Sequence, residues 1–245
     1  GNFEQEMLES VYAFTWIGAY AEARRIDAFM TFVPDIAAGR FEDRASAELK
    51  ADCDRFVAEN DEEWLHDYAL YRILKSQHDE QPWPAWDRRY VRRNAAALAE
   101  LEATADAKIA DIKVIQFLFF EQWGRFRKYA NDSGIYLFGD MPICIALDSA
   151  DAWAHREMLL VDENGKPSEV SGVPPDYFSE DGQLWGNPLY DWTYHLETGF
   201  QWWIRRMKHL AGQCDLVRID HFRGFESFWS VPFGETTAKN GAWVP

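Results

Sequence analysis

The sequence predicts an α/β protein in which a helical first part precedes parallel strands. Three observations support this class: helical periodicity up to about residue 108, two short apolar runs at 135–138 and 216–219, and an amphipathic helix before each run. Runs that are continuously apolar, rather than alternating, are typical of parallel strands buried on both faces. The order of helix, strand, long excursion, helix and strand indicates one β/α unit with residues 141–198 inserted after its first strand.

The first part of the chain has apolar residues at helical spacing and no strand pattern. It is expected to form amphipathic helical segments at about 3–20, 44–76 and 88–105. Asp61, which follows Asn60, is expected to end one helix and begin the next as its N-cap. The Gln81-Pro82-Trp83-Pro84 segment predicts a stop. Residues 1–108 are therefore interpreted as a helical subdomain.

The second part, residues 109–245, is interpreted as a partial catalytic barrel. A helix over 112–130, ended by Asn131-Asp132-Ser133-Gly134, leads into the first apolar run and then to Asp140. A helix over 200–210, closed by Gly212, leads into the second run and then to Asp220. A parallel barrel is the commonest scaffold in which such strands end in catalytic carboxylates, and those strand ends face one pocket. We therefore expect Asp140 and Asp220 to approach one another.

Paired carboxylates favour glycoside chemistry, in which one attacks or stabilises the anomeric carbon and another donates a proton to the leaving oxygen. Arg218 lies two residues before Asp220, so both side chains point to the same face of the strand. A nearby guanidinium lowers the pKa of a carboxyl group and keeps it ionised, as a nucleophile requires. His221 and Arg223 are candidates for hydrogen bonds to sugar hydroxyls. Asp is also frequent at strand ends without a catalytic role, so strand position alone leaves that alternative open.

The excursion contains a loop rich in Gly, Pro and aromatic residues. Rings that stack on sugar faces and amides that bind sugar edges together make it a candidate sugar-binding segment. Its candidate residues are Asp176, Tyr177, Phe178, Gln183, Trp185 and Asn187. An earlier segment, 158–166, predicts a β-hairpin with an Asn164-Gly165 turn. A calcium loop is the alternative there, but the spacing does not fit an EF-hand.

Composition excludes several classes of partner. The net charge of −16 opposes binding to nucleic acid or to an anionic membrane surface. No apolar run approaches the roughly 20 residues of a membrane helix, and the N-terminus has no signal-peptide pattern. The three cysteines lack metal-ligand spacing and predict free thiols in a reducing, cytoplasmic compartment. No metal or cofactor motif is found.

Three segments closely resemble the signature segments of 4-α-glucanotransferases, the amylomaltase or disproportionating-enzyme family. They are GDMPICIALDSADAW (139–153), SGVPPDYFSEDGQLWGNPLYDW (171–192) and VRIDHFRGF (217–225). The resemblance implies a (β/α)₈ TIM barrel with a helical subdomain inserted before its third strand. It implies transfer of α-1,4-glucan segments between maltooligosaccharides by a retaining double displacement, without metal or cofactor.

The same resemblance implies roles for individual residues. Asp220 would be the nucleophile with Arg218 beside it, and Asp140 would contact sugar near the cleavage point. The acceptor side would be held by Tyr177, Phe178, Gln183 and Trp185. The family's general acid/base Glu and third Asp lie on later strands than this chain reaches, and its first two barrel strands are not found here. We therefore expect an internal piece of a longer protein, inactive by itself.

Two other functions remain open at the level of sequence. One is an α-glucan hydrolase of the amylase type, which would release glucose and maltose. The other is a glucan-binding module without catalysis. A helical interaction protein would explain the first hundred residues, but it would not explain the two signature loops around Tyr177 and Asp220.

Overall fold

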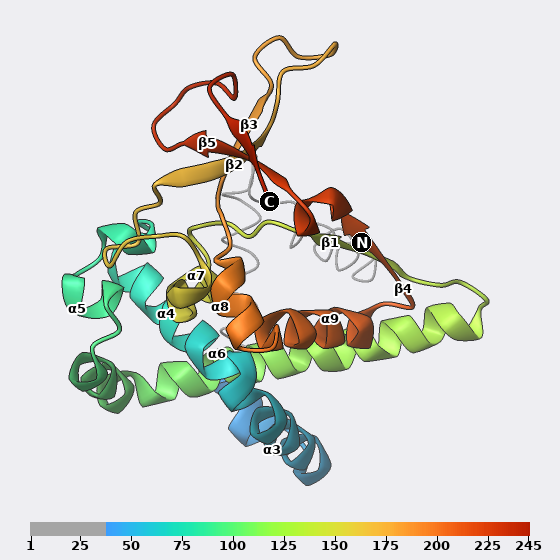
Figure 1. The fold of residues 1–245 in the computed structure, drawn as a ribbon. Helices are drawn as coiled ribbons and strands as arrows, with labels where there is room; N and C mark the ends of the chain where they lie inside the picture. The colour runs from blue at the N-terminus through green and yellow to red at the C-terminus, as the bar shows by residue number, and fades with distance from the viewer. Residues whose placement is uncertain (1–37) are drawn as a thin grey trace.

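The structure is a computed structural model and describes residues 38–245, so the helix expected at 3–20 lies outside the described residues. The α/β class is confirmed (Figure 1). The helices with both ends in the described part are α3 Ala47–Asn60, α4 His66–Gln77, α5 Arg88–Val91, α6 Ala95–Asp132, α7 Ala150–Ala154, α8 Trp192–Glu197 and α9 Gln201–Gln213. Short helical turns are η1 Asp61–Leu65, η2 Trp83–Ala85, η3 Arg156–Met158 and η4 Phe222–Phe225. The strands are β1 Phe138–Pro142, β2 Glu169–Val173, β3 Gln183–Pro188, β4 Leu216–Asp220, β5 Phe228–Pro232 and β6 Ala242–Val244.

The chain passes from α3 to α4 without the predicted break. The turn η1 is π-helical, and Asp61 has right-handed helical angles of φ −61° and ψ −51°. The expectation that Asp61 is an N-cap is therefore wrong. Its carboxylate instead forms an ion pair with Lys113 of α6 at 2.5 Å. That long-range partner, together with the wider π turn, lets the helix continue through Asn60.

The helix expected at 88–105 is divided, and the one expected at 112–130 begins much earlier. Arg93 has a positive φ of 50°, and Asn94 then caps α6 by accepting a hydrogen bond from the Ala97 N–H at 3.1 Å. α6 runs for 38 residues with a single non-helical position, Ala105 (φ −119°, ψ 15°). Residue 108, where the sequence suggests a division between two parts, lies inside α6. This helix also lies along α9 (Figure 1).

The two strands that carry the candidate carboxylates pair in parallel, as expected. β4 covers the apolar run predicted at 216–219, whereas β1 begins at Phe138, where the other predicted run ends. The reason is the end of α6: Gly134 has a φ of 78°, and the Ile135 N–H donates to the Ala130 carbonyl at 2.9 Å. This closing turn takes Ile135 out of the strand.

Asp215 fixes the start of both strands to the end of α6. Its carboxylate accepts hydrogen bonds from the Asn131 amide and the Leu137 N–H, each at 2.8 Å, and from the Arg127 guanidinium at 2.9 Å. These contacts, led by the Asn131 hydrogen bond, lower the pKa of Asp215 to about 2. The carboxylate therefore stays ionised at any pH at which the fold is ordinarily studied, and the register of β1 against β4 begins at a fixed point.

Only one face of the β1–β4 pair is covered in the described part of the chain. Met141 is buried and packs in one core cluster with Trp202 and Trp203 of α9. On the opposite face, Phe138 is 65% exposed and its partner Leu216 is 55% exposed. The expectation of strands buried on both faces is therefore wrong for residues 38–245, because no described element covers the second face.

A second sheet, antiparallel and in the order β3-β2-β5-β6, joins the excursion to the residues that follow β4. The sequence did not predict β5 or β6. In Figure 1 this sheet stands above α9, with the β2–β3 hairpin projecting from its top. The predicted turn at Asn164-Gly165 is present, with a Gly165 φ of 79°, but a single bridge between Val161 and Pro167 replaces the expected hairpin strands.

Gly139 permits the close approach of β1 to the end of α9. A Cβ at this position would lie 2.5 Å from the Cys214 Sγ. We expect Gly139→Ala to destabilise the full-length protein by about 1–3 kcal/mol, measured by urea denaturation, because the core must shift to make room. Cys214→Ala should restore part of the loss.

The matched control for this prediction is Gly212→Ala on α9, where an added Cβ meets nothing within 4 Å. It should leave stability unchanged or raise it slightly, because Ala favours the helix. Equal losses from the two Gly→Ala changes would contradict the steric explanation for Gly139.

His195 of α8 is fully buried among aromatic rings, including those of Tyr190 and Trp202. Burial lowers its pKa from the ordinary value of 6.5, although the Met158 backbone and Asp191 oppose the shift. Protonation therefore favours the unfolded state. The stability contributed by neutral His195 is complete above about pH 6.5 and is lost as the pH falls below that value.

We expect the urea midpoint of the full-length protein to be constant from about pH 7 to 8 and lower near pH 5.5. His195→Leu should flatten this decline, and His155→Gln, at a half-buried surface histidine, should leave it in place. His209, whose pKa burial also lowers, accounts for the part of the decline that remains. An unchanged pH dependence in His195→Leu would contradict the assignment.

No helix in residues 38–245 is both long and apolar enough to cross a membrane.

Candidate active site

Arg218 joins the two candidate carboxylates at the ends of β1 and β4. Its Nε donates to Asp140 Oδ1 at 2.9 Å and its Nη2 donates to Asp140 Oδ2 at 2.8 Å. The same Nη2 lies 3.1 Å from Asp220 Oδ1. The strand register accounts for this arrangement, since Asp140 is directly opposite Arg218 and Asp220 follows on the same face. The predicted approach of Asp140 and Asp220 is therefore present, with the guanidinium between them.

The two carboxylates at this site favour the charged form of Arg218. The hydrogen bonds and charge of Asp140, followed by the charge of Asp220, raise the pKa of Arg218, so the guanidinium is permanently charged. All three side chains are about half exposed. Ion pairs that are this open contribute little to stability. The arrangement therefore orients the two carboxylates and leaves them accessible from solvent, and it contributes little to the stability of the fold.

Beyond Asp220 the backbone turns sharply through His221, which has the left-handed angles φ 50° and ψ 48°. Such angles are uncommon for residues other than Gly. The His221 ring meets the Trp185 ring edge-on, with 4.9 Å between centroids. One end of the predicted sugar-binding segment therefore lies beside the residue that follows Asp220.

The tip of the β2–β3 hairpin carries two further predicted residues in an open position. Tyr177 is 97% exposed and Phe178 is 91% exposed, and their rings contact each other at 5.6 Å. Asp176 shapes this tip, because its Oδ1 accepts hydrogen bonds from the N–H groups of Phe178 and Ser179 at 2.8 Å each. The two ring faces are available to a ligand, whereas one oxygen of Asp176 is used by the loop.

The remaining predicted residues make contacts within the protein. Gln183 accepts a hydrogen bond from the Trp185 indole at 3.1 Å, and Asn187 donates one to the Ile145 carbonyl at 2.9 Å. The Arg223 guanidinium lies 4.0 Å from the ring centre of Trp243 in β6.

Sequence reasoning missed several residues that hold the site. Arg206 of α9 donates to the Pro142 carbonyl at 2.6 Å, at the end of β1. The Tyr190 hydroxyl donates to the Ile143 carbonyl at 2.8 Å. Trp243 supports Arg223. Nothing in the local sequence marks these residues, because each acts on a segment that is distant along the chain.

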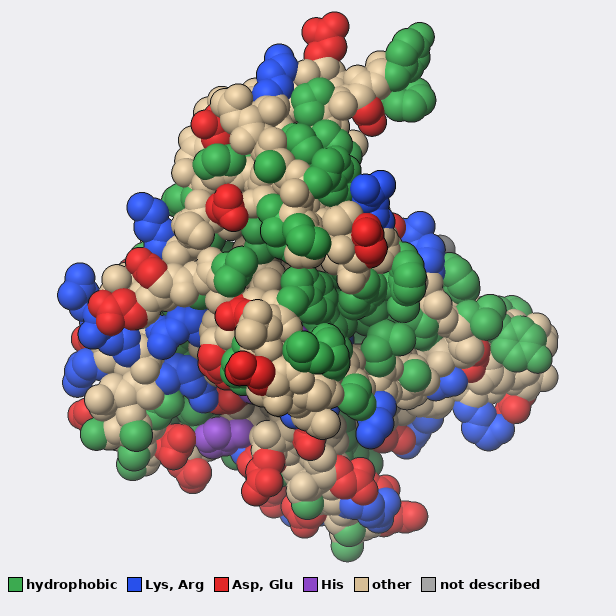
Figure 2. Space-filling model, viewed as in Figure 1, with side chains coloured by type: hydrophobic (Ala, Val, Ile, Leu, Met, Phe, Trp, Pro, Cys, Tyr) green, Lys and Arg blue, Asp and Glu red, His purple; other side chains and the backbone are tan. Residues whose placement is uncertain are grey.

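The surface around the site is mixed in character. Figure 2 shows hydrophobic side chains gathered between the four-stranded sheet and α9, with acidic and basic side chains around them. Among the described residues, no group of three or more His, Cys, Asp and Glu side chains is arranged to hold a metal ion. The chemistry available here is that of carboxylates, a guanidinium and aromatic rings.

Carboxylates at the ends of adjacent parallel strands, with an arginine between them and rings nearby, form the kind of site used by enzymes that act on glycosides. The sequence model of one protein family, described as 4-alpha-glucanotransferase, matches residues 14–245 of this chain. This chain belongs to the 4-alpha-glucanotransferase family, and the resemblance drawn from its three signature segments is confirmed.

Similar curated proteins carry the same description. The 4-alpha-glucanotransferase of Thermus thermophilus is 46% identical over 206 residues, which are 83% of this chain and 41% of that protein. The Synechocystis protein of that name is 48% identical over 184 residues, 75% of this chain and 36% of its own length. This chain therefore spans about two fifths of the relatives that it matches.

Solved structures agree with this assignment. The amylomaltase from Streptococcus agalactiae in complex with acarbose matches with a TM-score of 0.81 and 35% identity, over 94% of this chain and 44% of that one. The amylomaltase from Corynebacterium glutamicum shares the fold, with a TM-score of 0.63 and 19% identity.

Proposed function

We propose that the full-length protein is a 4-α-glucanotransferase that moves α-1,4-glucan segments between maltooligosaccharides. The observation that carries the proposal is the placement of Asp220 and Asp140 about one guanidinium at the ends of two parallel strands. Membership in the family and the similarity to an amylomaltase bound to acarbose support it. The full-length protein here means the product of the complete reading frame that encodes this chain.

The proposed mechanism is a retaining double displacement. Asp220 attacks the anomeric carbon and forms a glycosyl–enzyme ester, while the bond to the leaving glucan oxygen breaks and a carboxylic acid elsewhere in the full-length protein protonates that oxygen. The hydroxyl of a second glucan then attacks the same carbon, gives its proton to that carboxylate and releases Asp220. Arg218 pairs with Asp220 and orients its carboxylate, and Asp140 holds Arg218 in place.

We also propose sugar-binding roles for individual residues, according to the contacts that each side chain makes within the protein. His221 follows Asp220 directly, and its ring contacts that of Trp185, so these two residues are the strongest candidates. Tyr177 and Phe178 have exposed rings at the tip of the β2–β3 hairpin. Asp140 lies near the end of β1, and Arg223 lies in η4, just after the end of β4. Asp176, Gln183 and Asn187 each spend one polar atom on the protein itself, so we assign them mainly to holding the loop.

We further propose that β1 and β4 are neighbouring strands of a (β/α)₈ barrel, with the helical segment before β1 as an insertion. The parallel register and the covering helix α9 support this placement. The boundary between the helical subdomain, 1–108, and the barrel part, 109–245, would then lie within α6, so that this helix belongs to both. The cytoplasmic location and the lack of nucleic-acid partners stay predictions from charge and composition.

Product analysis tests the proposed function. The purified full-length protein is incubated with maltotriose, and the products are separated by chain length. Transfer produces a ladder of longer oligomers together with shorter ones, whereas glucose and maltose alone would indicate hydrolysis. Binding of maltotriose without any product would indicate a glucan-binding module. The 245-residue chain by itself should produce no ladder, because the proposed acid/base group lies outside it.

A further inference from the structure

The segment that follows β1 is held from three directions. We call residues 143–149 the rim loop, because it begins after Pro142, which is directly opposite Asp220 in the strand register. Its backbone carbonyls, and that of Pro142, accept hydrogen bonds from distant side chains. These bonds run from Arg206 to Pro142 (2.6 Å), from Tyr190 to Ile143 (2.8 Å), from Asn187 to Ile145 (2.9 Å) and from Trp83 to Leu147 (2.5 Å).

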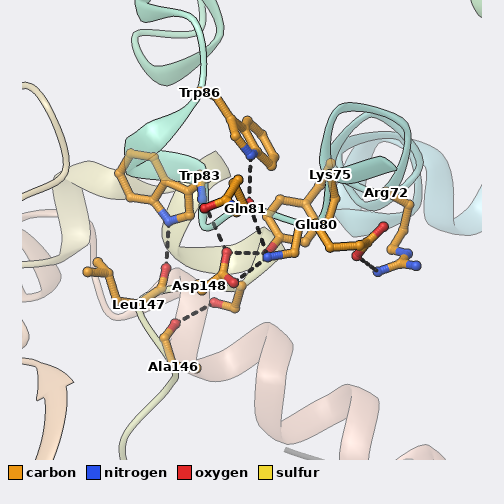
Figure 3. A network of polar contacts seen from close by, with 11 residues as sticks. Arg72, Lys75, Glu80, Gln81, Trp83, Trp86, Ala146, Leu147 and Asp148 are labelled. Carbon is orange, nitrogen blue, oxygen red and sulfur yellow. Dashed lines mark hydrogen bonds and ion pairs between the residues drawn. The ribbon is translucent and has the colours of Figure 1, made fainter. Parts of the chain in front are cut away.

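Asp148 anchors the far end of the rim loop to the helical part of the chain. Its Oδ1 accepts hydrogen bonds from the Tyr71 hydroxyl at 2.9 Å and from the Trp83 N–H at 3.2 Å. Its Oδ2 pairs with the Lys75 ammonium of α4, which also donates to the Gln81 carbonyl at 3.2 Å. Figure 3 shows Lys75 and Trp83 next to this carboxylate, while the Trp83 indole points to the Leu147 carbonyl.

Burial makes the pairing of Asp148 with Lys75 obligatory. The Lys75 side chain is only 11% exposed, and a buried ammonium group without a partner is costly. Burial, followed by the hydrogen bond to Asp148, raises the pKa of Tyr71, so its hydroxyl remains a donor. Three donors with fixed positions therefore determine where Asp148, and with it the rim loop, can lie.

A continuous set of contacts leads from Asp148 to the candidate nucleophile. Within the same loop, the Ile145 carbonyl holds Asn187 of β3. Two residues before Asn187 is Trp185, whose ring meets His221, the neighbour of Asp220. A displacement of the rim loop would therefore move the rings beside the site. Small displacements of groups that position a substrate are expensive for catalysis.

We propose that Asp148 is a positioning residue for the candidate sugar site. By tying the rim loop to α4, it lets the helical part of the chain determine where Trp185 and His221 lie relative to Asp220. The proposal rests on the proposed transferase function. It gives the helical part of the chain a role in that function, namely to position the rim loop.

The test uses Asp148→Ala, Asp148→Asn and the double variant Asp148→Ala/Lys75→Met in the full-length protein, with maltotriose as substrate. Asp148→Ala removes all three tethers and should lower kcat about tenfold with little change in KM, the order of effect expected from small misplacement. Asp148→Asn keeps one oxygen that can accept from Tyr71 and Trp83 but loses the partner of Lys75, so it should recover part of the activity.

The double variant separates positioning from stability. It removes the unpaired ammonium, so the urea midpoint should recover, while kcat should stay about tenfold low because the contacts between Asp148 and α4 are still missing. Recovery of kcat in step with stability, or a wild-type kcat in folded Asp148→Ala, would overturn the proposal. Leu101→Ala, in the same buried cluster, is the control for destabilisation alone and should keep the wild-type kcat.

A second measurement does not depend on activity. Amide hydrogen exchange in residues 143–149 should be at least about tenfold faster in Asp148→Ala than in the wild type, and unchanged in Leu101→Ala. Unchanged exchange in Asp148→Ala would overturn the tethering itself. Absence of transfer by the wild-type protein would instead refute the proposed function. The hydrogen-exchange result would then still show whether Asp148 holds residues 143–149 in place.

Discussion

Asp220→Asn in the full-length protein should abolish glucan transfer, lowering kcat by about 10⁴-fold or more, as removal of a covalent nucleophile does in other enzymes. Asparagine preserves the shape of the side chain but cannot form the glycosyl ester at a useful rate. The fold should survive, because the ion pair between Asp220 and Arg218 is half exposed and contributes little stability. The measurement is the rate of oligomer formation from maltotriose.

The matched control for this change is Asp162→Asn. Asp162 lies in the turn before β2, where its Oδ1 accepts hydrogen bonds from the N–H groups of Asn164 and Lys166. An asparagine oxygen can accept the same two bonds, so activity and stability should both remain close to wild type. An Asp220→Asn variant that retained a tenth of the wild-type rate would exclude Asp220 as the nucleophile.

Trp83→Ala should cause the largest loss of stability among the substitutions considered, about 3–5 kcal/mol by urea denaturation of the full-length protein. The Trp83 ring is fully buried and lies so close to Gly165 that a Cβ on the glycine would be 2.1 Å from it. Its indole also donates to the Leu147 carbonyl. Removal of the ring therefore leaves a cavity and an unpaired carbonyl at once.

Trp83→Phe divides these two contributions, because it keeps much of the ring but loses the indole hydrogen bond. Its cost should be intermediate, about 1–3 kcal/mol. Tyr177→Ala is the control for loss of an aromatic ring at an exposed position and should change stability by no more than about 0.5 kcal/mol. A loss in Trp83→Ala as small as that in Tyr177→Ala would contradict the description of the Trp83 core.

The sequence predicted the features of the site that depend on local geometry. Residues two apart on a strand share a face, which was sufficient to place Arg218 beside Asp220. The run at 216–219, which is apolar except for Arg218, located β4 correctly. Parallel pairing then placed Asp140 within reach, because β1 and β4 both end at the same edge.

The features that the sequence did not predict depend on distant contacts. The end of α6 takes Ile135 into its closing turn, so β1 starts later than its apolar run suggests. The ion pair with Lys113 lets the helix continue past Asp61. β5 pairs with β2, which lies more than fifty residues earlier in the chain, and no local pattern announces that partner. The hydrogen bond from the Asn187 amide to the Ile145 carbonyl also joins distant segments, while the role of Asn187 as a sugar ligand stays a prediction.

The pair β1–β4 gives the part of the chain that the structure describes a surface suited to self-association. Among the described residues neither outer edge of the pair has a strand beside it, and the open face adds Phe138 and Leu216. Free backbone donors and acceptors next to exposed apolar side chains favour edge-to-edge pairing with a second copy. Sedimentation of the 245-residue chain should therefore reveal aggregates that grow with concentration, while a longer chain that supplies the flanking strands remains dispersed.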